Sequence, residues 1–315
     1  MHSQPDPARR PRPALWNNPT LLLTLTALMW AGHSVVGRLA VGQISPMTLT
    51  CGRWALALLP IVYAARGSLR RDLEIMRPRW RYVAAMGALG FTAFNALFYV
   101  AAHRTTALNL SIIQGIIPAL VLVGARLFYR TRIGGLQALG TFATMLGVAA
   151  IAAQGDWERL AALAFNSGDV MILLACVIYA GYTLGLRNRP RVSGLGLLAA
   201  FAFVALLTSI PLFAFEIASG GFIWPTLRGL GVLAYAAFLP SFLSQLFFMR
   251  GVELIGPGRA GVFVNLVPLF GALMAVGLLG EPFAAYHIAA LALVIGGIAL
   301  AQRSPAQKSL ARPAQ

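Results

Sequence analysis

Four carboxamide side chains lie inside long apolar stretches of this sequence and are candidates for binding a polar solute. They are Asn95, Gln114, Gln245 and Asn265. A carboxamide both donates and accepts hydrogen bonds, which suits neutral or zwitterionic ligands. In apolar surroundings it needs a partner, which is either a ligand or a neighbouring helix. Both roles stay open for each of the four residues: contact with a substrate, or a hydrogen bond that holds two helices together.

A histidine and an arginine form a second candidate pair. His33 lies in the apolar stretch MWAGHSVVGR (29–38), and Arg53 lies in the next apolar stretch. Together they would present positive charge to a carboxylate substrate. In the alternative interpretation, backbone carbonyls near the end of the helix satisfy Arg53, and His33 makes only interior hydrogen bonds.

Aromatic rings accompany these polar residues at helical spacing. Trp30 lies one turn before His33, and Tyr99 lies one turn after Asn95. Rings beside a polar group suit an aromatic or amphipathic solute, although the same rings equally suit interior packing.

The elements that carry these residues are predicted to be membrane-spanning helices. The 315-residue chain is 58% hydrophobic and only 11% charged, whereas a soluble domain usually carries about 25% charged residues. The apolar residues also form blocks of about 20, the length with which a helix crosses a bilayer. We therefore expect an all-α, multi-pass membrane protein that is embedded in the lipid bilayer, which is its main partner.

Turn and charge signals divide the apolar sequence into ten expected spans. They cover residues 19–40, 47–65, 82–101, 107–127, 135–153, 169–187, 194–215, 229–249, 259–279 and 284–302. Alternate connections and the two tails hold 20 of the 25 basic residues. The positive-inside rule therefore places both termini in the cytoplasm of a bacterial cell, with the protein in the inner membrane. Because topology accounts for the positive charge, we expect no nucleic-acid partner.

An internal repeat organises the spans. WAGHSVVGR (30–38) aligns with YAGYTLGLR (179–187) at a shift of 149, and Pro118 aligns with Pro268 at a shift of 150. Tyr182 is the counterpart of His33 in this alignment, which makes it a further candidate for substrate contact. Each repeat holds five spans, and an odd number inverts the second copy in the membrane. Such folds usually bind their substrate near the midplane between the repeats.

Depth in the membrane can be counted from the turns of helical hairpins. A helix rises about 1.5 Å per residue, so residues equally far from a shared turn lie at similar depth. Asn95 and Gln114 are nine or ten residues from their turn, and Gln245 and Asn265 are about ten from theirs. About 15 Å is the middle of a hydrocarbon core about 30 Å thick. The repeat therefore predicts four carboxamides at one level, and the same count from the first hairpin pairs His33 with Arg53.

The chain resembles the drug/metabolite transporter superfamily of the EamA type over residues 19–303. The resemblance lies in WAGHSVVGR with SPMTLTCGRWALALL (45–59), in LFYVAAHRTTALNLSIIQGIIPAL (97–120), and in the stretch from Phe247 to Phe283 with its Gly-Glu-Pro turn. It implies ten transmembrane helices built as two inverted five-helix EamA repeats. The chain departs from the family in having His33 where a small polar residue is common. Thr131 also stands where the second repeat has Glu281.

The resemblance implies a secondary transporter that exports amino acids or other small amphipathic metabolites. The predicted organisation is a cytoplasmic tail (1–18), a first repeat (19–153), a periplasmic linker (154–168), a second repeat (169–303) and a cytoplasmic tail (304–315). Alternatives from other classes are a passive channel or solute- or lipid-translocating pore of the same fold, and a membrane-embedded enzyme. The sequence is also compatible with a homodimer.

Catalytic, metal and nucleotide motifs are not expected in this chain. No Ser/His/Asp constellation and no metal-ligand spacing is visible, and GPGRAG (256–261) opens an apolar span where a nucleotide-binding loop would follow a strand. We therefore expect no enzyme activity and no cofactor. His33 is the one deep residue that titrates near neutral pH, so proton coupling through His33 and transport without such coupling both stay open.

Overall fold

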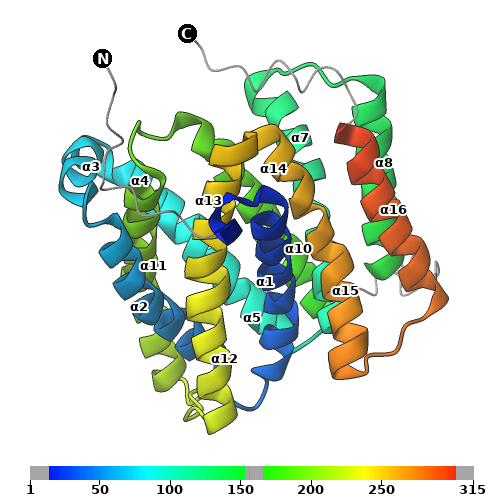
Figure 1. Ribbon diagram of the computed structural model, residues 1–315. Helices are drawn as coiled ribbons and strands as arrows, with labels where there is room; N and C mark the ends of the chain where they lie inside the picture. The colour runs from blue at the N-terminus through cyan, green and yellow to red at the C-terminus, as the bar shows by residue number, and fades with distance from the viewer. Residues whose placement is uncertain (1–13, 153–155, 157–165, 303–315) are drawn as a thin grey trace, which may run out of the picture.

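The computed structural model describes residues 14–152, 156 and 166–302, and every regular element in these ranges is a helix (Figure 1). In the first half, the α-helices are α1 (Pro19–Leu39), α2 (Pro46–Ala65), α3 (Leu69–Met76), α4 (Trp80–Gly87), α5 (Phe94–Ala102), α6 (Ala107–Gln114), α7 (Ile117–Tyr129) and α8 (Gly135–Ala152). In the second half, they are α10 (Ser167–Gly185), α11 (Gly194–Ala218), α12 (Leu227–Phe238), α13 (Ser244–Ile255), α14 (Pro257–Val264), α15 (Leu266–Leu279) and α16 (Ala285–Gln302).

Eight segments of the described chain are long and apolar enough to cross a membrane, counting helices that continue through a bend as one segment. Two shorter apolar helices, Gly135–Ile151 and Ala285–Ala301, occupy the places of the expected fifth and tenth spans. The all-helical, multi-pass prediction is therefore confirmed, whereas the count of ten spans stays a prediction.

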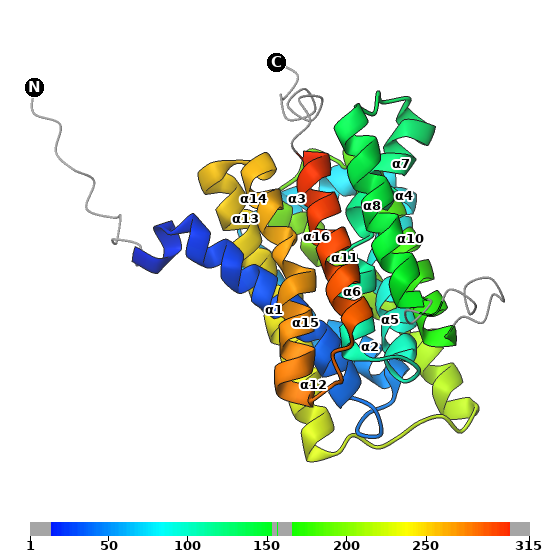
Figure 2. The ribbon, with the colours of Figure 1, turned by 90° about the vertical axis from the view of Figure 1, so that its right-hand side faces the viewer.

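The basic connections lie together at one end of the bundle. Helix α3 with its flanking arginines, the turn from α7 to α8 and the turn from α13 to α14 all lie at the upper end in Figure 1. Figure 2 shows the same arrangement from the side. Helix α1 runs away from this end and α16 runs toward it, so the bundle begins and finishes with antiparallel helices. The alternation of charge along the sequence thus becomes a difference between the two ends of the bundle.

Equivalent π-helical turns interrupt one long helix in each half. Residues Ala88–Ala93 join α4 to α5, and Leu239–Leu243 join α12 to α13, about 150 residues later. In the second turn, Pro240 has no N–H to donate to the carbonyl of Ala236. The hydroxyl of Ser241 donates to that carbonyl instead, at 2.6 Å. The carbonyl of Ala236 therefore keeps a donor despite the proline, as low-dielectric surroundings require.

Equivalent breaks also divide the fourth span of each half. Helix α6 ends at Gln114 and α7 begins at Ile117, while α14 ends at Val264 and α15 begins at Leu266. Prolines in the first turn of α7 and α15, 150 residues apart in sequence, cannot donate the backbone hydrogen bonds that would continue one helix into the next. Both breaks place a carboxamide, Gln114 or Asn265, at the point where the helix changes direction.

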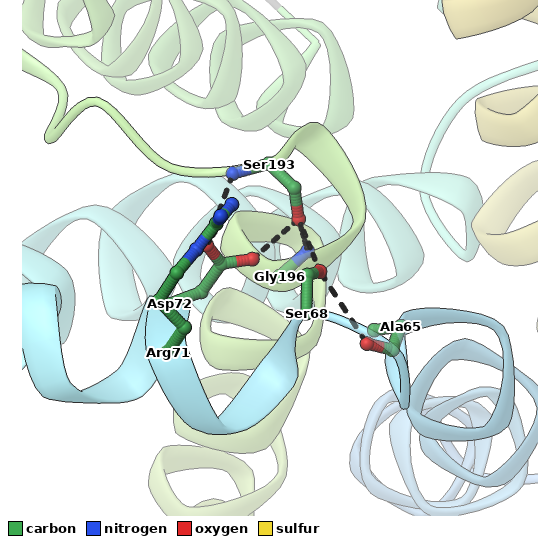
Figure 3. A network of polar contacts seen from close by, with 6 residues as sticks. All are labelled: Ala65, Ser68, Arg71, Asp72, Ser193 and Gly196. Carbon is green, nitrogen blue, oxygen red and sulfur yellow. Dashed lines mark hydrogen bonds and ion pairs between the residues drawn. The ribbon is translucent and has the colours of Figure 1, made fainter.

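Three carboxylates bind helix N-termini and connect the halves. Glu216, in the last turn of α11, accepts hydrogen bonds from the backbone amides of Met47 (2.9 Å) and Thr48 (3.0 Å) in α2. Asp72 accepts a hydrogen bond from the hydroxyl of Ser193, the N-cap of α11 (Figure 3). Helices α2 and α11 are antiparallel neighbours. The positive end of α2 therefore receives a carboxylate from the last turn of α11, and the positive end of α11 receives one from α3, which follows α2. The third carboxylate, Glu281, binds α6 in the same way.

Helices α8 and α16 pack closely against each other along their length (Figures 1 and 2). Their closest approach is at Gly140 and Gly297, where an added Cβ on either residue would lie 2.3 or 2.5 Å from the carbonyl oxygen of the other. Only glycine allows backbones this near, as in other small-residue contacts between membrane helices. Helices α8 and α16, the last helices of the two halves in the described chain, therefore form a closely packed pair.

Candidate functional site

A cavity of about 200 Å³ lies where the helix breaks and the π-helical turns of the two halves meet. Both halves contribute to its lining. The first half does so through α1, α2, α5 and the break after α6, and the second through α10, the π-helical turn η5 (Leu239–Leu243), α13 and the break after α14. All four predicted carboxamides line it: Asn95, Gln114, Gln245 and Asn265. The structure therefore brings together, around one space, residues that lie as far as 170 positions apart in sequence.

Arg53 is the centre of a buried polar network at this cavity. Its guanidinium donates from Nε to the Oγ of Ser241 at 2.7 Å, and from Nη1 to the Oδ1 of Asn95 at 2.5 Å and the hydroxyl of Tyr99 at 2.9 Å. The Nε2 of His33 lies 3.3 Å from the same Nη1. Ser241 belongs to the second half, so one arginine connects α2 to α1, α5 and the π-helical turn η5. The side chain meets no backbone carbonyl in this network, which goes against the alternative that carbonyls satisfy it.

His33 lines the cavity as a packed ring. It stacks on Phe98 with 4.4 Å between ring centroids and is 6% exposed. Since a guanidinium only donates, Nε2 acts as the acceptor and the ring hydrogen belongs on Nδ1. That Nδ1 atom has no hydrogen-bond partner in the described part of the chain.

The carboxamides differ in how fully their hydrogen bonds are used. Asn95 accepts from Arg53 and donates to the carbonyl of Phe91, so it is held on both sides. Gln114 donates to the hydroxyl of Ser34 (3.2 Å) and to a carbonyl of its own helix. Gln245 makes no side-chain hydrogen bond to another described residue. Gln245 is therefore the cavity carboxamide with the most capacity left for a ligand.

Aromatic rings form much of the remaining lining. Trp54 stacks on Phe91 with centroids 4.8 Å apart and planes 13° apart, and Phe94 lies 4.9 Å from Tyr179. Trp30, in α1, is a further aromatic ring of the lining. Among the described residues that line the cavity, none carries a carboxylate. The space is thus aromatic, with carboxamides, one imidazole and one guanidinium as its polar groups.

Two predicted contact residues lie outside the lining itself. Tyr99 stands behind Arg53 and reaches the cavity only through its hydrogen bond to that side chain. Tyr182 packs against Phe91 and Phe201, with centroids 5.8 and 6.0 Å away. Its place in the lining is taken by Tyr179, the residue that the repeat aligns with Trp30. The repeat alignment predicted the correct helix, α10. The rotation of α10 about its own axis decides which of its two tyrosines faces the cavity.

Sequence reasoning did not single out four further lining residues. Trp54 follows Arg53 directly, and Phe91 and Phe94 precede Asn95 by four positions and one position, so their places on the same helices were visible signals. Ser241 carried no such signal, because its position depends on the π-helical turn. A regular helix would rotate it to another face.

The chain matches known proteins over nearly its full length. Two successive matches to the EamA-like transporter family cover residues 18–153 and 166–302. The chain belongs to the EamA-like transporter family. The double match also supports the internal repeat, because each half matches the family on its own.

Relatives of this EamA-like transporter include proteins with and without a stated substrate. An uncharacterized transporter of Bacillus subtilis, YyaM, is 28% identical over 277 residues, covering 84% of this chain and 86% of its own. A probable terminal-alkyne amino-acid exporter of Streptantibioticus cattleyicolor is 24% identical over 285 residues, covering 89% and 92%. A protein of known crystal structure shares the fold, with a TM-score of 0.62 at 18% identity over 94% of this chain and 99% of that one.

Proposed function

We propose that this EamA-family transporter is a ten-span secondary carrier of the bacterial inner membrane that exports small amphipathic metabolites. The cavity between the two halves supports this proposal most directly, because four carboxamides and a guanidinium converge there from both repeats. Inverted-repeat carriers bind their solutes at such a position and expose it alternately to the two sides. The amino-acid exporter among the relatives is consistent with a small polar solute.

In this proposal the helix breaks provide the moving parts. Interrupted helices at Gln114 and Asn265 have fewer backbone hydrogen bonds to lose when one half-helix tilts against the other. The tightly packed α8 and α16 pair would stay fixed while the cavity-lining helices rock. Both termini and the arginine-rich connections would face the cytoplasm.

A counterflow experiment in proteoliposomes tests the carrier. Vesicles preloaded with an unlabelled candidate solute should take up the labelled solute several-fold faster than empty vesicles, and the initial rate should saturate with concentration. Gln245→Ala should reduce this rate, whereas Asn188→Ala, which changes an exposed carboxamide outside the cavity, should not. Flux that rises linearly with concentration and shows no counterflow would contradict the carrier and favour a passive pore of the same fold.

Orientation is tested separately with reporter fusions. Alkaline phosphatase fused after residue 302 should be inactive and a fluorescent protein fused there should fluoresce, because both results indicate a cytoplasmic C-terminus. An active phosphatase at that position would overturn the proposed orientation.

A further inference from the structure

Among the residues that the structure describes, the guanidinium of Arg53 has no anionic partner. None of the acidic side chains in the described part of the chain lines the cavity. Six of them bind elsewhere: Asp72 with Ser193, Glu74 with Arg70, Asp169 with Thr105 and Asn109, Glu216 with Met47 and Thr48, Glu253 with Arg250, and Glu281 with Ala107 and Leu108. The seventh, Asp156, is exposed. A buried charge without a counter-ion is strongly unfavourable, and its retention points to an anion that arrives from outside.

One nitrogen of this guanidinium, Nη2, is unused. Hydrogen bonds to described residues occupy Nε and Nη1, whereas Nη2 has none. Arg53 is 5% exposed, and it lines the cavity. Three neighbours hold the planar group at fixed orientation, so the free N–H groups are positioned before a ligand binds. A carboxylate oxygen is an anionic acceptor that can take a charge-assisted hydrogen bond from such an N–H group.

The rest of the cavity indicates the body of the ligand. Trp30, Trp54, Phe91, Phe94 and Tyr179 surround the space beside the guanidinium with apolar ring surface. A volume of about 200 Å³ is small for a ligand site, yet a cavity of about 150 Å³ holds a benzene molecule. The space therefore fits one ring or a short alkyl chain together with its carboxylate.

We propose that the cavity selects a monocarboxylate with an aromatic or apolar body, and that Arg53 binds the carboxylate. This inference rests on the proposed function, and it names the class of solute carried. An amino acid fits less well, because no carboxylate of the lining would pair with its ammonium group. That group would lose its hydration and receive only neutral carboxamide oxygens and ring faces in return.

The orientation of the bound anion follows from the asymmetry of the repeat. Arg53 lies eight residues after Ser45, the N-cap of α2, and the residue eight after Ser193, the N-cap of α11, is Phe201. Phe201 is 1% exposed and packs in the apolar core. The second half thus offers no equivalent cation, and the carboxylate has one binding position.

Binding of four matched probes to the purified full chain in lipid nanodiscs tests the inference without requiring transport. The probes are 3-phenylpropionate, L-phenylalanine, 2-phenylethylamine and 3-phenyl-1-propanol, which share one ring and differ in charge. At neutral pH, 3-phenylpropionate should bind at least tenfold more tightly than the other three. Equal affinity for the acid and the alcohol, or tighter binding of the amino acid, would overturn the inference.

Variants connect this selectivity to Arg53. Arg53→Gln should weaken 3-phenylpropionate binding roughly 10- to 100-fold, while the affinity for 3-phenyl-1-propanol changes little. Arg38→Gln is the matched control, because Arg38 donates to the carbonyl of Ala102 and does not line the cavity. If Arg53→Gln does not fold, Arg53→Lys serves instead, since it keeps the positive charge and loses the Nη2 group proposed to meet the carboxylate. Unchanged affinity in a folded Arg53 variant would contradict the proposed role.

Flux measurements separate this inference from the proposed function. Arg53-dependent binding of 3-phenylpropionate without counterflow would support the carboxylate site and count against a carrier. Counterflow of L-phenylalanine or an amine that is insensitive to Arg53→Gln would support the carrier and overturn the carboxylate site.

Discussion

The carboxylate of Glu281 accepts a hydrogen bond of 2.8 Å from the backbone amide of Leu108, a residue of the other repeat. A second bond, of 2.9 Å, comes from the amide of Ala107. These amides belong to the first turn of α6, which has no partners for them within the helix. A carboxylate there is also favoured by the helix dipole. The connection between α15 and α16 is thus anchored to the helix that carries Gln114 into the cavity.

Glu281→Gln should therefore destabilise the protein by about 1–3 kcal/mol, because the charge is lost while the shape is kept. Thermal unfolding in detergent, followed by tryptophan fluorescence, measures the change. Glu253→Gln is the control, since Glu253 is an exposed residue with one ion pair to Arg250. An equal shift in both variants would contradict the special role of Glu281.

The cap on α11 offers a second test. The hydroxyl of Ser193 accepts from the amide of Gly196 (2.9 Å) and donates to Asp72 (Figure 3). The same hydroxyl lies 2.9 Å from that of Ser68. Ser193→Ala removes these hydrogen bonds and leaves a carboxylate with fewer donors, so we expect a loss of about 1–2 kcal/mol. Ser193→Thr should keep most of the stability. If Ser193→Ala unfolds at the wild-type temperature, the cap does not contribute as described.

The contact between α8 and α16 predicts opposite outcomes for two adjacent glycines. Gly297→Ala places a methyl group against the backbone of Gly140, whereas the space around Gly296 is open within 4 Å. Gly297→Ala should cost about 1–3 kcal/mol, and Gly296→Ala should be neutral or slightly stabilising. Yield after purification and the unfolding temperature report the difference. Similar behaviour of the two variants would show that the helices do not touch at this point.

The position of His33 predicts that it does not carry protons. Its Nε2 lies against the guanidinium of Arg53, and a proton added there would break that contact. In His33→Asn, the transport rate should fall, but the dependence of the rate on pH between about 6 and 8 should match that of the wild type. Initial rates at a series of pH values provide the comparison. A flattened profile in the variant would establish His33 as the coupling group.

Counting residues from hairpin turns predicted which polar side chains come together in the structure. Asn95, Gln114, Gln245 and Asn265 all line one cavity, and His33 contacts Arg53. The count succeeds because the rise per residue is nearly constant even where a helix bends. Membership of the family and the all-helical fold also followed from the sequence pattern.

Rotation about the helix axes was harder to predict. Tyr182 was expected at the site as the counterpart of His33, yet Tyr179 faces the cavity. Ser241 reaches Arg53 only because a π-helical turn changes the angular position of every later side chain. Periodicity assumes 3.6 residues per turn, so a local change of pitch is invisible to it.

The two π-helical turns also carry information about the history of the gene. A wide turn holds one residue more than an α-helical turn, and Ala88–Ala93 and Leu239–Leu243 occupy the same place in each repeat. Two independent insertions at matching sites after the duplication require more events than a single insertion before it. The extra residue is therefore older than the duplication, and the ancestral repeat already had the bent helix that today borders the cavity twice.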